Sequence, residues 1–418
     1  MVSKRYAVAN NDYVSDYDPS QPSVYVLSYD AVNLYGTSMR YPLPTGNLRF
    51  LDSPDEFDYE SVDLEGESGY LLEVNLQYPP ELHEKHDSYP VAAEHLDIKP
   101  NMLSEYNADD SNFLGQTLLV PNLRDKQNYV LHIPNLRLYA ELGLKVTKIH
   151  RVLAFDQSTW LRVYIDFNTE KRKFARSDFE RELYKLMSNA IYGKSIESVR
   201  KRSNVKLVCD PNKAKKAIRK PTCQKWEHVN SDLIMIQSMK PRVLMEKQIY
   251  IGTCVLEISK TIMYQFYYQH MLNRYAATDI DLLYTDTDSL TYEIRTRDVY
   301  RDMLADIDKF DTSDYPRTHF LYSETNRKRL GCFKDENSKS SPIKEFCGLR
   351  SKMYSVLFDD GDGKLTAKGI PKTYRNKTCD TKNSRERCVK KATFRRIKAR
   401  NHRLQTVQIT KISLSSYD

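Results

Sequence analysis

The sequence predicts an α+β protein, and three observations lead to that class. Short apolar runs rich in β-branched and aromatic residues are typical of strands, and they occur at 23–29, 70–78, 282–284, 290–292 and 352–358. Two longer segments, 177–196 and 254–272, carry helix signals. Strand and helix segments do not alternate regularly, which argues against a doubly wound parallel sheet.

The strand predictions rest on local pattern and on what ends each run. Residues 23–29 are rich in β-formers and end at Asp30, as a buried strand would. Residues 70–78 alternate between apolar and polar and end at Pro79-Pro80, which cannot continue a central strand. Residues 285–289 are predicted to form a tight turn between two further strands.

The helix predictions rest on capping and composition. Ser177 can cap a helix, and Glu180 stands three residues later, as in a capping box. Residues 254–272 are apolar over more than five turns of helix. We therefore expect a capped, partly polar helix at 177–196 and a long, apolar-rich helix at 254–272.

Length and composition narrow the class of protein. The 418 residues allow about two to four domains. No run of about 18 apolar residues is present, and the first residues are polar, so neither a membrane span nor a signal peptide is expected. Seven cysteines occur without a CxxC pair or Cys/His zinc spacing, as expected for reduced thiols in an intracellular protein.

The net charge of +8 is strongly segregated. Residues 200–225 carry a net +9 and residues 372–403 a net +11, whereas residues 51–115 carry a net −15. Basic blocks of this size suit a phosphate backbone, but they also occur as solvated faces, disordered segments or localisation signals. The acidic block cannot lie on DNA.

Three short segments carry the chemistry: YDAVNLYG at 29–36, YKLMSNAIYGK at 184–194 and YTDTDS at 284–289. Asp286 and Asp288 are two residues apart, so on an extended backbone they point the same way, and two divalent metals would relieve their repulsion. The same spacing also occurs in many ordinary surface turns. Asp30, at the end of a strand, is either a turn residue or a site residue.

The second segment places unusual side chains on one helix face. Lys185, Asn189 and Tyr192 fall at i, i+4 and i+7, and Arg181 extends the stripe by one turn. This stripe is either a solvated surface or a cationic face that grips a polyphosphate, with Tyr192 and Gly193 close to a base pair.

Together and in this order, the segments resemble the three polymerase motifs of family B DNA polymerases. The closest likeness is to the protein-primed branch found in polinton-like transposons, related viruses and linear plasmids. Residues 30–36 look like motif A, 185–194 like motif B and 284–289 like motif C. The similarity covers nearly the whole chain, including 70–94, 126–155, 347–356 and 367–372. Asn75 departs from it, standing where an Asp is expected.

The resemblance implies a right-hand polymerase fold of palm, fingers and thumb, with two insertions of the protein-primed type. Only 29 residues precede Asp30, so we expect the polymerase module alone, without an exonuclease domain or proofreading. We expect the start of the palm, with motif A, at 1–50. An insertion of the type that contacts a terminal protein follows at 51–149 and contains palm strand 70–80. The later parts are fingers with motif B (150–200), a basic insertion (201–245), palm with motif C (246–345), and thumb with a basic tail (346–418).

The resemblance also implies roles for individual residues. Asp30, Asp286 and Asp288 match the catalytic carboxylates, which bind two Mg²⁺ ions, with Mn²⁺ as an alternative ion. The residues that match the nucleotide-binding set are Leu34, Tyr35, Lys173, Lys185, Asn189 and Tyr192. Tyr35 matches the side chain that lies under the deoxyribose and clashes with a 2′-hydroxyl.

Residues expected to contact DNA lie in three places. Gly193 lies within motif B, Lys352 and Tyr354 match a motif that steadies the primer terminus, and Arg200, Lys201 and Arg202 begin the +9 block. We expect charge reversal at the last three to depress processive synthesis. The expected partners are primer–template DNA, deoxynucleoside triphosphates and a terminal protein docked on the acidic block, with no membrane.

The leading hypothesis is a DNA-templated DNA polymerase, acting inside the cell in a nucleus or at the replication site of a virus or element. One rival is an inactive or truncated remnant that only binds DNA. Another is an enzyme that uses an RNA template or ribonucleotides. Tyr35 argues against ribonucleotides, whereas the sequence leaves the template type and the primer open.

Overall fold

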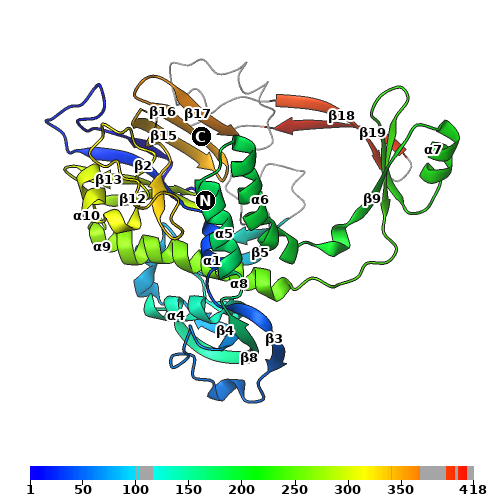
Figure 1. The fold of residues 1–418 in the computed structure, drawn as a ribbon, viewed down its shortest axis with the longest axis horizontal. Coiled ribbons are helices and arrows are strands. Elements are labelled where there is room, and N and C mark those ends of the chain that lie inside the picture. The colour runs from blue at the N-terminus through cyan, green and yellow to red at the C-terminus, as the bar shows by residue number, and fades with distance from the viewer. Residues whose placement is uncertain (100–101, 103–115, 340, 368–391, 401–402, 412–418) are drawn as a thin grey trace.

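The computed structural model describes all residues except 100–101, 103–115, 340, 368–391, 401–402 and 412–418. Strands and helices are mixed without regular alternation, so the α+β prediction is confirmed (Figure 1). Residues 368–391, which hold much of the +11 stretch, lie outside the described residues.

The first sheet, here called the carboxylate sheet, positions Asp30. Its strands pair antiparallel in the order β12 (Ile280–Thr285), β13 (Ser289–Arg295), β2 (Val24–Ala31) and β14 (Phe333–Asp335). The predicted strands on both sides of the turn at 285–289 therefore form. Asp30 stands opposite Ser289 on one side and Lys334 on the other. Segments near residues 30, 289 and 334, which are far apart in the sequence, thus meet at the end of β2.

A second antiparallel sheet lies below the first in Figure 1. Its strands, in order, are β3 (Leu43–Phe50), β8 (Lys145–Ser158), β4 (Ser68–Gln77) and β7 (Lys126–His132). The predicted strand at 70–78 forms as β4, but its partners are β8 and β7 rather than the strands that carry the carboxylates. The acidic loop 51–67 lies below this sheet, with most of its residues exposed.

The long apolar helix lies between these two sheets. The predicted helix at 254–272 forms as α8 (Ile249–Tyr264), and it continues through a π-helical stretch (Gln265–Met271) into α9 (Leu272–Arg274). Side chains of this helix share one buried cluster with residues of both sheets and of α4 (Ile133–Glu141). A helix that contacts core on several sides is apolar all round, which explains its composition.

Tyrosine, with 30 copies, is used heavily in this core. The rings bury apolar surface, while the hydroxyls reach polar partners. The Tyr268 hydroxyl donates to the Tyr89 carbonyl at 2.7 Å, and the Tyr264 hydroxyl donates to the Pro90 carbonyl at 3.3 Å. The core is therefore tied to the loop before β5 (Glu94–Ile98) by hydrogen bonds as well as by packing.

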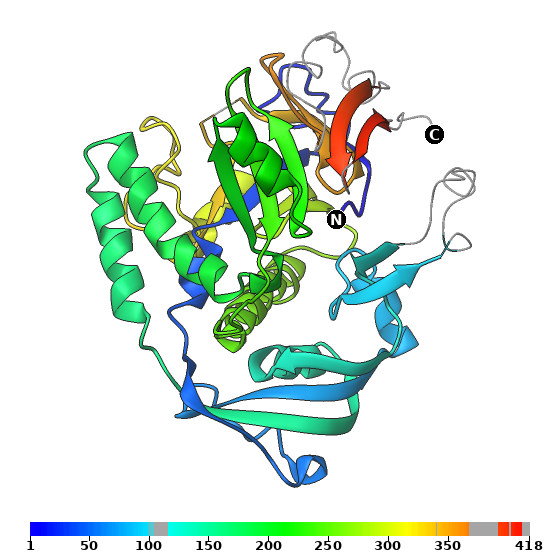
Figure 2. The same cartoon turned by 90° about the vertical axis from the view of Figure 1, so that its right-hand side faces the viewer.

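A pair of helices, α5 (Arg162–Lys173) and α6 (Asp178–Ser195), stands beside the end of the carboxylate sheet (Figures 1 and 2). Ser177 caps α6 as predicted, accepting a hydrogen bond from the Glu180 amide. Gly252 lets α8 approach the end of α6, because a Cβ there would lie 2.1 Å from an Ile196 methyl carbon. The helix pair is thus seated on the buried core helix.

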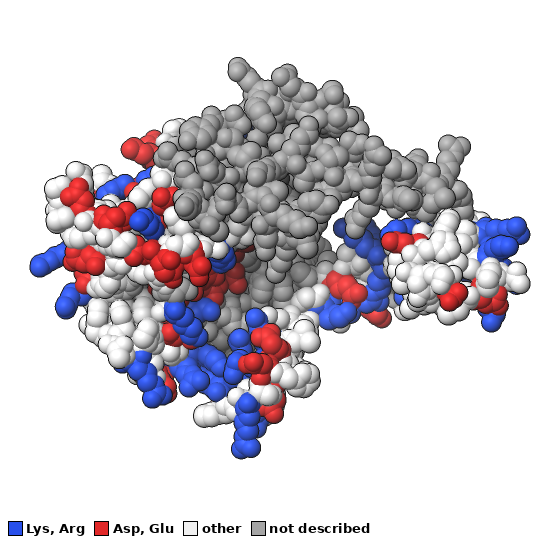
Figure 3. Space-filling model, turned by 90° about the horizontal axis from the view of Figure 1, so that it is seen from above, with Lys and Arg blue, Asp and Glu red and all other residues white. Residues whose placement is uncertain are grey.

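The basic segment 201–245 forms a separate lobe at the right of Figure 1. It contains β9 (Ser203–Val208), α7 (Pro211–Ile218), β10 (Cys223–His228) and β11 (Ile234–Met239). Ala214, Cys223 and Ile236 give the lobe a small core of its own. Lys and Arg side chains cover its outer end in Figure 3.

The remaining strands form three smaller groups, namely β1 (Tyr6–Val8) with β15 (Ile343–Arg350), β16 (Met353–Phe358) and β17 (Gly363–Ala367), β5 with β6 (Gln116–Val120), and β18 (Ala392–Arg400) with β19 (Arg403–Lys411). The strand predicted at 352–358 forms as β16. No helix in the described part is both long and apolar enough to cross a membrane. The division into palm, fingers and thumb stays a prediction.

Candidate active site

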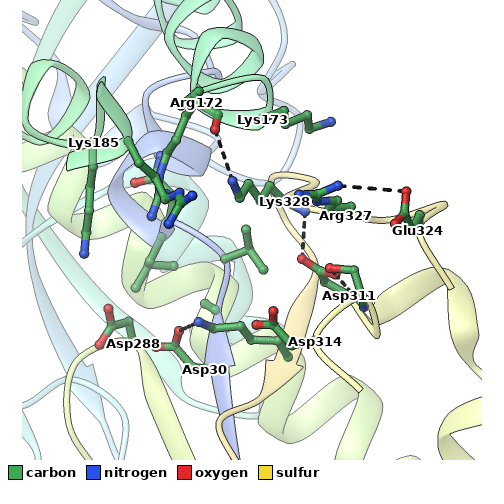
Figure 4. Close-up of a pocket in the computed structure, with 18 of the residues that line it drawn as sticks. Asp30, Arg172, Lys173, Lys185, Asp288, Asp311, Asp314, Glu324, Arg327 and Lys328 are labelled. Atoms are coloured by element: carbon green, nitrogen blue, oxygen red, sulfur yellow. Dashed lines mark hydrogen bonds and ion pairs between the residues drawn. The ribbon is translucent and has the colours of Figure 1, made fainter. Parts of the chain in front are cut away.

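A polar cavity of about 740 Å³ opens where three parts of the chain meet (Figure 4). Its floor is the end of β2 with the start of α1 (Leu34–Ser38), and one wall is the α5–α6 pair. The opposite wall comes from residues 311–339. Most of the lining is charged, which is the property to expect of a site for a polyphosphate or for metal ions.

Asp30 and Asp288 lie on the floor of this cavity. The Asp30 carboxylate is 3.3 Å from the Lys334 ammonium on the neighbouring strand. Burial raises the pKa of Asp30 to about 6, with the charge of Asp288 acting in the same direction and Lys334 opposing it. Burial also raises the pKa of Asp288. The fold therefore holds two carboxylates in one partly buried place, where ionising both of them costs free energy.

Asp286 does not join Asp30 and Asp288 in the lining of the main cavity. The backbone between Asp286 and Asp288 is not extended, contrary to the prediction, because Thr287 has a φ of +67°. The Asp288 amide donates to the Asp286 carbonyl at 2.8 Å, as in a γ-turn. The Asp286 carboxylate accepts a hydrogen bond of 2.6 Å from Lys352 and does not line the main cavity.

The two floor carboxylates fit a divalent cation. Among the described residues, no group of three or more His, Cys, Asp or Glu side chains is placed to hold a metal ion. Mg²⁺, however, is usually held by one or two carboxylates together with substrate phosphates and water. Asp30 and Asp288 supply such a pair, and the cavity above them has room for the phosphates.

The helix wall is cationic. Arg172 and Lys173 end α5, and Arg181, Lys185 and Asn189 follow one face of α6, all lining the cavity. In Figure 4, Lys185 reaches from α6 towards the floor carboxylates. The Asn189 side-chain oxygen is buried without a hydrogen-bond partner. The structure thus places three predicted nucleotide-binding residues, Lys173, Lys185 and Asn189, in one wall.

The aromatic pair of motifs A and B lies at the edge of the cavity. Tyr35 lines the cavity, and its ring stacks on Tyr192 with the centroids 4.1 Å apart. Burial raises the pKa of Tyr192 well above its ordinary value, and Tyr35 adds to this effect. The Leu34 side chain is buried in the core, only 3% exposed, although the residue also lines the cavity. Gly193 is exposed, and a Cβ there would contact nothing within 4 Å.

The third wall of the cavity was not predicted from the sequence. Residues 311–332, here called the cavity loop, bring Arg317, Arg327 and Lys328 to the cavity, and Lys334 and Lys339 follow. The available signal was the basic run 327–329 shortly before a short strand. This run is distant in sequence from the three motifs, so the sequence did not show that it lines the same cavity.

The predicted DNA contacts lie outside the main cavity. Tyr354 lines a second pocket of about 170 Å³ together with Asp286 and Asp288. Arg200 and Lys201 are exposed, whereas Arg202 forms an ion pair of 2.8 Å with Glu197. The structure therefore separates these residues into a group near the carboxylates and a group at the foot of the small lobe.

Comparisons with known proteins identify the family of this chain and solved structures of similar fold. The family "DNA polymerase type B, organellar and viral" matches residues 18–282. Solved structures with a similar fold include Phi29 DNA polymerase in a ternary complex with primer-template DNA and incoming nucleotide substrates, at 14% identity and a TM-score of 0.53, covering 99% of this chain and 61% of that one. An orthorhombic crystal form of Phi29 DNA polymerase gives 13% identity, a TM-score of 0.55, and 99% and 62% coverage. No curated protein sequence matches.

Proposed function

This chain belongs to the organellar and viral family of type B DNA polymerases, and from that premise we propose that it is a DNA-templated DNA polymerase. It spans about three fifths of the length of the Phi29 polymerase structures that it resembles. The observation that carries the proposal is the cavity, where Asp30 and Asp288 face a wall of Lys and Arg. A deoxynucleoside triphosphate needs both features at once.

The proposed reaction is nucleotidyl transfer. The oxygen of a primer hydroxyl forms a bond to the α-phosphorus, and the bond from that phosphorus to the oxygen leading to the β-phosphate breaks. Pyrophosphate leaves with the bonding electrons, and the hydroxyl proton passes to solvent. Such a transfer depends on in-line positioning and on neutralising the charge of the phosphate oxygens.

The helix wall supplies the neutralising charge. Lys185, Lys173 and Arg181 bind the triphosphate by charge-assisted hydrogen bonds. Asn189 completes the wall, and its buried, unpartnered oxygen accepts a hydrogen bond from the substrate. Because these groups lie on two packed helices, they are held in position before the substrate arrives.

Asp30 and Asp288 would hold the divalent metal, proposed as two Mg²⁺ ions or, as an alternative, Mn²⁺. When bound, the metal supplies positive charge at the reacting oxygens. The carboxylates bind it in their ionised form, so Lys334 must release Asp30 or share it. Asp286, predicted as a third ligand, is held by Lys352 on the other side of the turn.

The proposed partners follow from the assignment of this chain as a DNA polymerase. Primer–template DNA carries the primer hydroxyl, or a terminal protein supplies one. Lys352 and Tyr354, near the floor carboxylates, are proposed to steady the primer terminus. Arg200 and Lys201 are proposed to contact DNA phosphates, and the exposed acidic loop 51–67 to face a basic terminal protein.

The test is primer extension by the purified chain on a DNA template, with Mg²⁺ and deoxynucleotides, compared with Asp288→Ala. We expect extension by the wild-type chain only. DNA binding measured in parallel separates the rivals. A chain that binds DNA with strong salt dependence but never extends a primer would be a DNA-binding remnant, and equal extension by both chains would remove Asp288 from the active site.

A further inference from the structure

The cavity loop is fixed at its base by two buried polar side chains. Asp311, 7% exposed, accepts a hydrogen bond of 2.7 Å from the Lys328 amide. Asn326, 6% exposed, donates to the carbonyls of Ile307 and Phe310 at 2.8 and 3.0 Å. Buried polar groups that are fully bonded give a loop a defined shape. The loop is therefore a built wall of the cavity rather than a loose connection.

Lys328 is held in an uncommon conformation. Its φ is +52°, in the left-handed region that costs a non-glycine residue about 1 kcal/mol or more. Backbone outliers of this kind concentrate where a side chain must be aimed at a ligand. The Lys328 ammonium points across the cavity and donates to the Arg172 carbonyl at 3.1 Å, at the end of α5 (Figure 4).

Positive charge gathers at this point and is offset only in part, by the charge of Asp314 acting on Lys328 and that of Glu182 acting on Arg172. Among the described residues, Lys328 has no ion pair with a carboxylate, and neither has Arg172 or Lys185. The Arg172 Nε is buried without a hydrogen-bond partner. Burial lowers the pKa of Lys328, and the charges of Arg172 and Arg327 lower it further. Cations brought together from separate segments repel one another. A bound polyanion would relieve this repulsion.

We infer that Lys328 binds the polyphosphate of the nucleotide substrate, gripping it from the side opposite α6 and together with Arg172. This inference rests on the proposed function, because it names a further ligand of the same substrate. Lys328 lines the same cavity as the floor carboxylates, so its ammonium, at the end of α5, meets phosphates held in that cavity. The departing pyrophosphate leaves through the same contacts.

The first test measures binding without chemistry. Inorganic triphosphate and dATP are titrated into the full chain by calorimetry, without DNA, for wild type and Lys328→Met. Methionine keeps the apolar stem and removes the charge. We expect affinity for both ligands to fall about tenfold or more, as for loss of a hydrogen bond to a charged group. Lys328→Arg should retain most of the affinity.

The matched control is Lys309→Met. Lys309 is exposed, precedes the cavity loop by two residues in the sequence, and does not line the cavity. It should leave both affinities unchanged. If Lys328→Met binds triphosphate as wild type does, the inference is wrong. Weaker binding of a single-stranded oligonucleotide alone would assign Lys328 to DNA phosphate and would also overturn it.

A second test uses the wild-type chain, so that folding of a variant does not matter. Lysines are acetylated with and without inorganic triphosphate, and the modified sites are identified by mass spectrometry. Triphosphate should protect Lys328 but not Lys309, and equal labelling of Lys328 would contradict the inference. Protection in a chain that never extends a primer would keep the polyphosphate site and reject the polymerase function.

Discussion

The rings of Tyr35 and Tyr192 stack with centroids 4.1 Å apart and planes inclined by 18°. Tyr35 comes from α1, directly after the carboxylate strand, and Tyr192 comes from the last turn of α6. The stack therefore links the floor of the cavity to its helix wall. Because Tyr35 lines the cavity and Tyr192 does not, the second ring supports the first.

Removing the Tyr35 ring should relax sugar selection. Tyr35→Ala opens the cavity beside the floor carboxylates, where a 2′-hydroxyl would otherwise meet the ring. We expect the ratio of kcat/KM for a ribonucleotide over the matching deoxynucleotide to rise about tenfold or more, since a steric block of this kind is worth more than 1 kcal/mol. Tyr35→Phe keeps the ring and should behave as wild type.

The support role of Tyr192 has its own test. Tyr192→Leu removes the stacking partner but leaves the Tyr35 ring in the cavity wall. It should raise the same ratio by less than Tyr35→Ala does. Equal ratios in wild type, Tyr35→Ala and Tyr192→Leu would show that this aromatic pair does not select the sugar.

The two acids of the β12–β13 turn should differ in their effects. Asp288 lines the main cavity with Asp30, whereas Asp286 is held by Lys352. Asp288→Asn should lower the single-turnover extension rate by about a thousandfold or more, because several kcal/mol of charge stabilisation depend on it. Asp286→Asn should cost about tenfold. Equal losses, measured at saturating Mg²⁺, would mean that both acids bind the metal directly.

A Lys352 variant also tests whether Asp286 acts differently from Asp288, because Lys352 binds Asp286. If its main task is to hold Asp286, Lys352→Ala and Asp286→Asn should not add in a double-mutant cycle. If Lys352 contacts the primer independently, the two losses should multiply, and the KM for primer should rise in Lys352→Ala alone.

Local pattern predicted the elements that carry the motifs. The buried run before Asp30, the Ser177 cap and the apolar helix after residue 250 each have a signal within about ten residues, and all three form. Partners distant in sequence carry no such signal. Lys352 stands 66 residues from Asp286, and Lys328 stands 156 residues from Arg172. The ion pair at the turn was therefore not predictable, and the basic run 327–329 gave no indication of the cavity that it would join.

Local pattern also does not predict the sheet to which a strand belongs. The alternation of residues 70–78 predicts a strand but does not name its neighbours. β4 pairs with β8 and β7, since apolar side chains of these strands share one core with α4 and α8. The positive φ of Thr287 is likewise set by the hydrogen bonds of the turn rather than by residue preference, because a β-branched residue disfavours that region.

Asp335 should make stability depend on pH. It is buried on β14 beside the Tyr315 hydroxyl at 2.9 Å, and burial raises its pKa from 3.8 to about 6. The native state thus binds this proton more tightly than the unfolded state, so the contribution of Asp335 to the free energy of unfolding rises as pH falls from about 7 to 4. Two pKa units correspond to about 3 kcal/mol.

Asp335→Asn isolates this contribution from that of the other acids. Relative to wild type, the variant should be most stable above pH 7, and the difference should shrink by about 2–3 kcal/mol towards pH 4.5. Tyr315→Phe removes a hydrogen bond that lowers the Asp335 pKa, so its transition should move to higher pH. Urea unfolding at several pH values measures both, and a difference that does not vary with pH would contradict the prediction.

The foot of the small lobe should contact DNA through Arg200 and Lys201 rather than Arg202. The first two are exposed, whereas Arg202 makes two hydrogen bonds to Glu197 at 2.8 and 3.0 Å. That contact holds the pKa of Glu197 near 2, with Lys194 and Lys247 adding to the effect. The Arg202 charge is thus already matched by a carboxylate, and less of it is available to a phosphate.

Replacing Arg200 and Lys201 by Ala together should weaken DNA binding and reduce the slope of log K against log salt by about 1.4–1.8, the value for two lost phosphate contacts. Reversing both charges should also shorten the products made per binding event. Arg202→Ala should reduce the slope by less. Lys145→Ala with Lys148→Ala, two exposed lysines on β8, is the matched control and should leave the slope unchanged. Unchanged extension by the charge-reversed chain at physiological salt would place DNA elsewhere.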